Sequence, residues 1–188
     1  MSSAAESESG EVWDLLDVDG RATGRVVRRA AQGDPGGNLA PGDRHRVVAC
    51  GIFGPDGRLL VQQRAADKPN WPNLWDITAG GSALAGETGR QAVARELFEE
   101  VGLVHDFTDL PPIITVNRDS GPLEVYLIEA DVDLSTLVLQ ASEVQAVAWA
   151  TREEVDGLVR AGRFALTGSF MALLFDLRAW PDVDVPDR

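Results

Sequence analysis

The sequence predicts an α/β protein in which helices and mixed β-sheets form a sandwich. Short apolar segments bounded by turn residues alternate with amphipathic stretches that begin at capping residues, the order of elements expected of that class. A chain of 188 residues with 44% hydrophobic content is also long enough to bury a sizeable core. We therefore expect one domain over residues 11–180, with a disordered N-terminus over 1–10 and a tail over 181–188.

The first part of the chain is expected to form strands. Val12–Arg29 carries two apolar runs around the turn signal Asp17–Gly20, which predicts a hairpin. Ala31–Asp43 contains four glycines and two prolines and is typical of an irregular connection or a flap. A second hairpin over Arg46–Phe53 and Arg58–Gln63, and a short strand over Trp75–Ala79, are expected to follow.

A helix is predicted after these strands. Thr88 is placed to cap it, the helical spacing runs to Val101, and Gly102 supplies a left-handed stop. Its apolar face, which should pack on the core, comprises Val93, Leu97 and Val101, with Ala94 and Phe98 alongside. The remaining expected elements are strands over Ile113–Val116, Leu123–Ala130 and Val144–Ala150, a helix from a capping box at Thr151–Glu154 towards Arg160, and a helix over Gly168–Trp180 ended by Pro181.

Three carboxylates lie on one turn of the first predicted helix. Glu96, Glu99 and Glu100 are spaced by three and four residues, which places them within an arc of roughly 100° and, we expect, on the face opposite the apolar one. Crowded like charges oppose folding, whereas a hard divalent cation such as Mg²⁺ binds carboxylate oxygens and would neutralise them. The alternative is a solvated acidic helix face.

The composition restricts the partners that we expect. The formal charge of −13 and the pI near 4.5 argue against unspecific binding to nucleic acid or to an anionic membrane. No apolar run reaches membrane-spanning length, and Cys50 is the only cysteine, so no intrachain disulfide forms. These features favour a cytoplasmic protein with a small phosphorylated ligand, and a homodimer stays open.

The stretch from Gly81 to Leu103 reads G-x5-E-x7-R-E-U-x-E-E-x-G-U, where U is apolar, and every constrained position is filled. This pattern resembles the signature of Nudix hydrolases. The resemblance implies an α/β/α sandwich with a loop-helix-loop signature and a Mg²⁺ cofactor, with Mn²⁺ as a substitute. It also implies that Glu99 and Glu100 are metal ligands, that Glu96 is a ligand or the base that activates water, and that the Gly80 carbonyl adds an oxygen.

Other residues take supporting roles in the same resemblance. Arg95 is expected to pair with Glu87 or Glu99 and to hold the carboxylates in place. Many members of the family recruit a further carboxylate from outside the signature. Glu143 occupies a plausible position for it, and Glu124 is the competing candidate.

A basic and aromatic cluster lies just upstream of the signature. It consists of Arg64, Lys68, Trp71, Pro72 and Trp75, and it is suited to gripping phosphates and covering an apolar or aromatic group. In the alternative interpretation, Trp75 belongs to the core while Arg64 and Lys68 are ordinary exposed cations.

This cluster, together with His45, also resembles isopentenyl diphosphate isomerase, a specialised relative within the same superfamily. In that alignment the catalytic cysteine falls on Ala79, one metal-binding histidine falls on Gly81, and another falls on Asn38. Glu124 matches the glutamate region alone. Because these groups are missing while the three glutamates of the signature are intact, we expect hydrolysis rather than isomerisation.

The sequence thus predicts a Mg²⁺-dependent hydrolase that cleaves a diphosphate linkage in a nucleoside diphosphate derivative or a related organic diphosphate. The alternatives are an isomerase-like enzyme and a noncatalytic sensor that binds a nucleotide derivative. The intact carboxylates weigh against the sensor.

Overall fold

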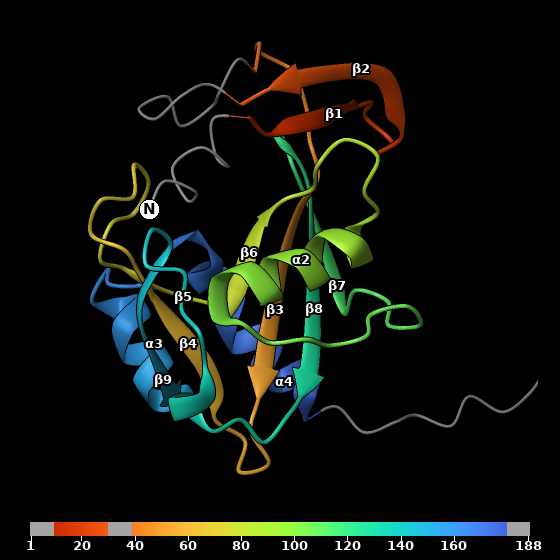
Figure 1. Ribbon diagram of the computed structural model, residues 1–188. Helices are drawn as coiled ribbons and strands as arrows, with labels where there is room; N and C mark the ends of the chain where they lie inside the picture. Colours follow the sequence, from red (N-terminus) through yellow and green to blue (C-terminus); the bar gives the residue numbers. More distant parts are fainter. Residues whose placement is uncertain (1–9, 30–38, 180–188) are drawn as a thin grey trace, which may run out of the picture.

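The computed structural model describes residues 10–29 and 39–179, and it has the predicted α/β architecture (Figure 1). The expected disorder over 1–10, the tail, and most of Ala31–Asp43 fall outside the described residues. The elements are β1 (Val12–Leu16), β2 (Ala22–Arg28), β3 (Val47–Phe53), β4 (Leu59–Arg64), β5 (Trp75–Asp76), β6 (Ala79–Ser82), α2 (Gly89–Val101), β7 (Ile114–Arg118), β8 (Gly121–Glu129), β9 (Val144–Ala150), α3 (Arg152–Arg160) and α4 (Met171–Arg178), with 3-10 turns at Leu134–Thr136 and Leu166–Phe170.

The main sheet is mixed and divides along β3. At its C-terminal end β3 pairs antiparallel with β4, through Ile52 and Phe53, whereas its N-terminal half pairs with β6 instead. On its other edge β3 runs parallel to β8, which in turn pairs with β7. Beyond the division, β4 pairs with β5 and β9. Strands β4 and β6 therefore diverge from a common start on β3.

Helices cover both faces of this sheet, so the predicted sandwich is confirmed (Figure 1). Helix α2 packs on one face through Val93, Leu97 and Val101, all of which are fully buried. Helices α3 and α4 cover the other face, where Val155 and Leu174 are buried in a second apolar cluster. No described helix combines the length and the apolar character needed to cross a membrane.

Helix α2 begins and ends at the residues that the sequence predicted. Thr88 forms a capping box with Gln91, and Gly102 ends the helix with a φ of 75°, in the left-handed region that glycine tolerates. The expectation that all three glutamates lie on the face opposite the apolar one is wrong, because Glu96 and Glu100 are buried. Phe98, which we expected beside the core, is 58% exposed.

The single strand expected over Trp75–Ala79 is in fact two. β5 pairs with β4, the chain then crosses the division, and β6 pairs with β3 and contains the glycine pair. Thr78 stands at the crossing, where its hydroxyl donates to the Leu60 carbonyl and accepts from the Ile52 amide. One side chain thereby satisfies backbone groups of β3 and β4 where the two strands meet.

The N-terminal hairpin β1–β2 packs against the loop before α2 (Figure 1). The Ala85 amide donates to the Val12 carbonyl at 2.7 Å, and the Gly86 amide donates to the Asp14 carboxylate at 2.8 Å. Trp13 stacks on His45, with ring centroids 4.6 Å apart. The hairpin is thus fixed next to the signature segment.

Candidate active site

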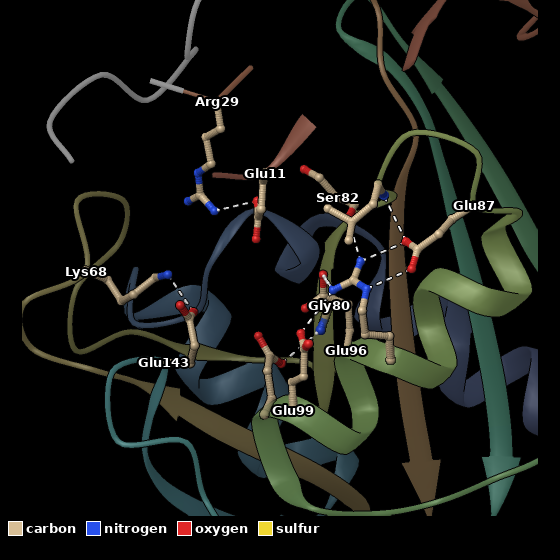
Figure 2. A network of polar contacts seen from close by, with 12 residues as sticks. Glu11, Arg29, Lys68, Gly80, Ser82, Glu87, Glu96, Glu99 and Glu143 are labelled. Atoms are coloured by element: carbon tan, nitrogen blue, oxygen red, sulfur yellow. Dashed lines mark hydrogen bonds and ion pairs between the residues drawn. The ribbon is translucent and has the colours of Figure 1, made fainter. Parts of the chain in front are cut away.

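Arg95 of α2 contacts three glutamates, Glu87, Glu96 and Glu99, whose positions are labelled in Figure 2. Its Nε and Nη2 donate to the two carboxylate oxygens of Glu87 at 2.9 and 3.0 Å, and its Nη1 donates to Glu96 at 2.9 Å and to Glu99 at 3.0 Å. The expected pairing with Glu87 or Glu99 is therefore present with both. A fourth carboxylate, that of Glu100, lies on the same helix and bonds to Gln62 and Gly80 instead of Arg95, so acidic groups outnumber the single guanidinium here.

Glu100 joins the helix to both sides of the divided sheet. Its Oε2 accepts from the Gly80 amide of β6 at 3.0 Å and from Gln62 Nε2 of β4 at 2.9 Å. The side chain is almost completely buried, and burial raises the pKa of Glu100 well above its ordinary value, with the nearby charges of Glu96 and Glu143 adding to the increase. A buried carboxylate is thus held in a defined orientation at the point where β4 and β6 separate.

Glu96 occupies the space above Gly81. A Cβ added to Gly81 would lie 2.2 Å from Glu96 Oε1, so only glycine leaves room for this carboxylate. Burial raises the pKa of Glu96 to about 7, although Arg95 opposes that shift. A carboxyl group with a pKa near neutrality is suited to exchange protons with water.

The donor set fits a hard divalent cation. Each of Glu96, Glu99 and Glu100 has one oxygen engaged in the contacts above, and its second oxygen has no hydrogen-bond partner within the described residues. Oxygen ligands of this kind are those that Mg²⁺ and Mn²⁺ prefer. In the part of the chain that the structure describes, no three Asp, Glu, His or Cys side chains already converge on one point.

The two candidates for a further ligand differ in their surroundings. Glu124 forms an ion pair with Arg46 at 2.8 Å and accepts from the Tyr126 hydroxyl at 2.9 Å. Glu143 lies close enough to Glu100 to raise the pKa of that group, and it pairs with Lys68 at 2.5 Å (Figure 2). Proximity to Glu100 favours Glu143.

A cavity of about 330 Å³ lies between the diverging strands, next to Gly80 and Gly81. Its walls are largely apolar, with Val47, Ala49, Ile77, Val116, Leu123 and Phe170 among the lining side chains. Two residues of the predicted basic and aromatic cluster, Arg64 and Trp71, line it. Lys68 points to Glu143, and the backbone of Trp75 bonds to that of Arg163 and Ala165.

Sequence reasoning missed several side chains at this site. Gln62 contacts Glu100, Arg118 lines the cavity, and the pair Glu11–Arg29 on the N-terminal hairpin lies near the glutamates, where the charge of Glu11 contributes to the raised pKa of Glu96. Gln62 carried a weak signal, because it is the first polar residue after the apolar run Leu59–Val61. The other three lie far from the signature in sequence and carried none.

Comparisons with known proteins concern the domain as a whole. Residues 43–170 match the family model described as the NUDIX domain. A protein from Listeria innocua named as an uncharacterised Nudix hydrolase is 40% identical over 168 residues, covering 89% of this chain and 95% of that protein. An isopentenyl-diphosphate Delta-isomerase from Brevibacterium linens is 30% identical over 150 residues, 72% of this chain and 81% of that enzyme. A crystal structure of a Deinococcus radiodurans protein, 24% identical, superposes with a TM-score of 0.68 over 91% of this chain and 100% of that one.

Proposed function

The chain belongs to the Nudix family of hydrolases, and we propose that it uses Mg²⁺, or Mn²⁺ in its place, to cleave the diphosphate linkage of a nucleoside diphosphate derivative or a related organic diphosphate. The observation that carries this proposal is the excess of buried negative charge at Gly81. Three carboxylates, those of Glu87, Glu96 and Glu99, share the single guanidinium of Arg95, and the buried carboxyl of Glu100 lies beside them with no cation of its own in the described part of the chain. An added divalent cation would restore the balance of charge there.

We assign roles to the residues from their contacts. Glu99 and Glu100 would hold the cation, with Glu143 and the Gly80 carbonyl as further oxygen donors, and Glu96 would accept a proton from the attacking water. When bound, the cation would offset the charge that develops on the phosphate oxygens and lower the pKa of that water. Arg95 and Glu87 position the carboxylates, and the organic group of the substrate would enter the cavity past Arg64 and Trp71, with Lys68 and Trp75 behind that wall.

Isomerisation is the second candidate, because one of the relatives above is an isopentenyl-diphosphate isomerase. The residues at the aligned positions weigh against it. Ala79 is fully buried in the core beneath α2 and has no ionisable group, and Gly81 has no side chain. Asn38, the third such position, lies outside the described residues.

The test is hydrolysis of a panel of organic diphosphates by the purified protein with Mg²⁺, Mn²⁺ or EDTA. Nucleotide sugars, dinucleoside polyphosphates, oxidised nucleotides and isopentenyl diphosphate would be assayed for release of phosphorylated products and, separately, for isomerisation. We expect hydrolysis that requires the metal. Isomerisation, with or without metal, would contradict the proposal, and tight binding of nucleotides without turnover would favour a sensor.

Glu99→Gln and Arg160→Gln provide a matched pair of variants. Both change an exposed or half-exposed charged residue on a helix, so neither should alter the free energy of unfolding by more than about 0.5 kcal/mol. Only Glu99→Gln should raise the Mg²⁺ concentration needed for half-maximal turnover, since only Glu99 is a proposed ligand. Equal metal dependence in the two variants would remove Glu99 from the site.

A further inference from the structure

Arg118, at the end of β7, has no counterion in the part of the chain that the structure describes. Its side chain is half-buried and lines the cavity. Among the described residues its guanidinium makes one long hydrogen bond, from Nε to the Gly121 carbonyl at 3.4 Å, and it has no carboxylate partner. An arginine offers five N–H donors, so most of the hydrogen-bonding capacity of this group is unused by the protein.

The other basic residues near the cavity are compensated. Arg64 lies 3.8 Å from the Asp76 carboxylate and donates to the Asn70 carbonyl, and Lys68 is paired with Glu143. Burial lowers the pKa of Arg118, and no opposing effect of a neighbouring anion acts on it. In a chain with a formal charge of −13, an unpaired arginine in an apolar cavity is a costly arrangement unless a ligand completes it.

The sheet separates Arg118 from the proposed metal site. The strand order β6-β3-β8-β7 places β7 three strand spacings from the glycine pair, a distance of about 14 Å between backbones. The apolar side chains of Val47, Val116 and Leu123 line the cavity between them. A diphosphate bound at Glu99 and Glu100 would therefore leave the organic part of the substrate lying towards Arg118.

We propose that Arg118 is a specificity-determining residue that binds a second anionic group, a phosphate monoester or a carboxylate, on the organic part of the substrate. The substrate class is then an organic diphosphate that carries a further anion, which narrows the proposed function and rests on it. Both groups share the pair of anionic oxygens that a guanidinium binds in a bidentate manner. A second polar atom supports a polar ligand in the cavity, since Gln62 Oε1 is buried and has no donor within the described residues.

Two pairs of probe ligands distinguish a phosphate from a carboxylate as the second anionic group. ADP is compared with its 3′-phosphorylated form, and UDP-glucose is compared with UDP-glucuronate, which differs by one carboxylate. Dissociation constants are measured by calorimetry in EDTA, so the result does not depend on turnover. We expect the added anion to tighten binding about tenfold or more in at least one pair, and the pair that responds identifies a phosphate or a carboxylate.

Variants of Arg118 then test whether the ratio of the two dissociation constants within a pair depends on this side chain. Arg118→Gln should remove the preference within the responding pair while the parent probe binds as before, Arg118→Lys should keep part of it, and Arg160→Gln should keep all of it. The Tm of unliganded Arg118→Gln should equal or exceed that of the wild type, because the variant removes a desolvated, unpaired charge. The assignment would be overturned if the wild type bound both members of each pair with equal dissociation constants. It would also be overturned if Arg118→Gln weakened the binding of both members of a pair equally, or if this variant had a lower Tm than the wild type.

These outcomes are separate from those of the hydrolase test. A protein that hydrolyses diphosphates without discriminating within the pairs would keep the proposed function and lose the role of Arg118. A protein that discriminates within the pairs but hydrolyses nothing would lose the proposed function and keep an anion-binding cavity.

Discussion

Replacing Gly81 with alanine should inactivate the protein without unfolding it. The new Cβ would lie 2.2, 2.4 and 2.6 Å from Glu96 Oε1, Cδ and Oε2, whereas ordinary contacts begin at 3.4 Å. The carboxylate must therefore move by about 1 Å, and a displacement of that size at a reacting group costs roughly a hundredfold in rate. Because Glu96 is the proposed proton acceptor, the loss should fall on kcat.

The effect of Gly81→Ala on stability should be small. Gly81 has no positive φ, so alanine suits its backbone, and the atoms in its way belong to the end of a flexible side chain. Weakening the Arg95–Glu96 hydrogen bond costs about 1–2 kcal/mol, while the lower entropy of the unfolded chain returns about 0.4–1 kcal/mol. The free energy of unfolding should therefore fall by no more than about 1.5 kcal/mol.

Gly157→Ala is the matched control. Gly157 lies within α3, far from the glutamates in sequence, and an added Cβ would meet no atom within 4 Å. It should leave kcat and KM unchanged and raise the free energy of unfolding by about 0.5–1 kcal/mol. Kinetics with Mg²⁺ and urea unfolding compare the two variants. A wild-type kcat in Gly81→Ala would refute the role of Glu96. A loss of more than about 3 kcal/mol in the free energy of unfolding would refute the expectation that the Glu96 side chain can move to make room for the added Cβ.

Three further predictions follow from buried titratable groups. Glu100→Gln should lower kcat/KM by about a hundredfold or more. In EDTA at pH 8, however, the variant should unfold at a higher urea concentration than the wild type, because burial disfavours the ionised carboxylate. A lower urea midpoint for the variant would contradict this prediction. His45 has a pKa lowered to about 4 by burial and by the charges of Arg118 and Arg29, so its contribution to stability is fully present above pH 6.5 and is lost as the pH falls towards 4, by up to about 3 kcal/mol. His45→Phe, which retains a ring against Trp13, should remove that part of the pH dependence of urea unfolding, and an unchanged difference between pH 7 and pH 4 would disprove it. Lys68→Met should destabilise the fold by about 2 kcal/mol because it removes the ammonium that pairs with the partly buried Glu143 carboxylate near Glu100, and the double variant with Glu143→Gln should recover most of that loss in thermal unfolding.

Sequence reasoning succeeded where the cause of the structure is local. The capping box at Thr88, the left-handed Gly102 and the apolar spacing of α2 act within a few residues of one another, and the helix begins and ends as predicted. The exposure of the glutamates depends instead on strands that are far away in the chain. Glu100 is buried because β4 and β6 both approach it, and no local pattern in the sequence encodes that approach.

The division of the sheet was hidden for the same reason. Trp75–Ala79 has the β-prone composition of one strand, and its two ends do form strands. They pair with different partners because the β3–β4 pairing ends after Ile52 and Phe53, which leaves the N-terminal half of β3 free to accept β6. The cavity lies next to that division and is also lined by Arg118 of β7, which is far from the signature in sequence, so neither could be predicted from the signature.

Gly81 also separates the two chemistries that the sequence leaves open. In the isomerase alignment a metal-binding histidine takes this position, but any side chain there would collide with the Glu96 carboxylate as it stands. The glycine and the buried glutamate therefore depend on each other, and keeping one without the other would leave a void or a clash. Ala79 lies on the core face beneath α2 and is fully buried. A nucleophile or acid at that position would first have to be freed from the core, so restoring isomerase chemistry would require a change in packing as well as substitutions at Ala79, Gly81 and Asn38.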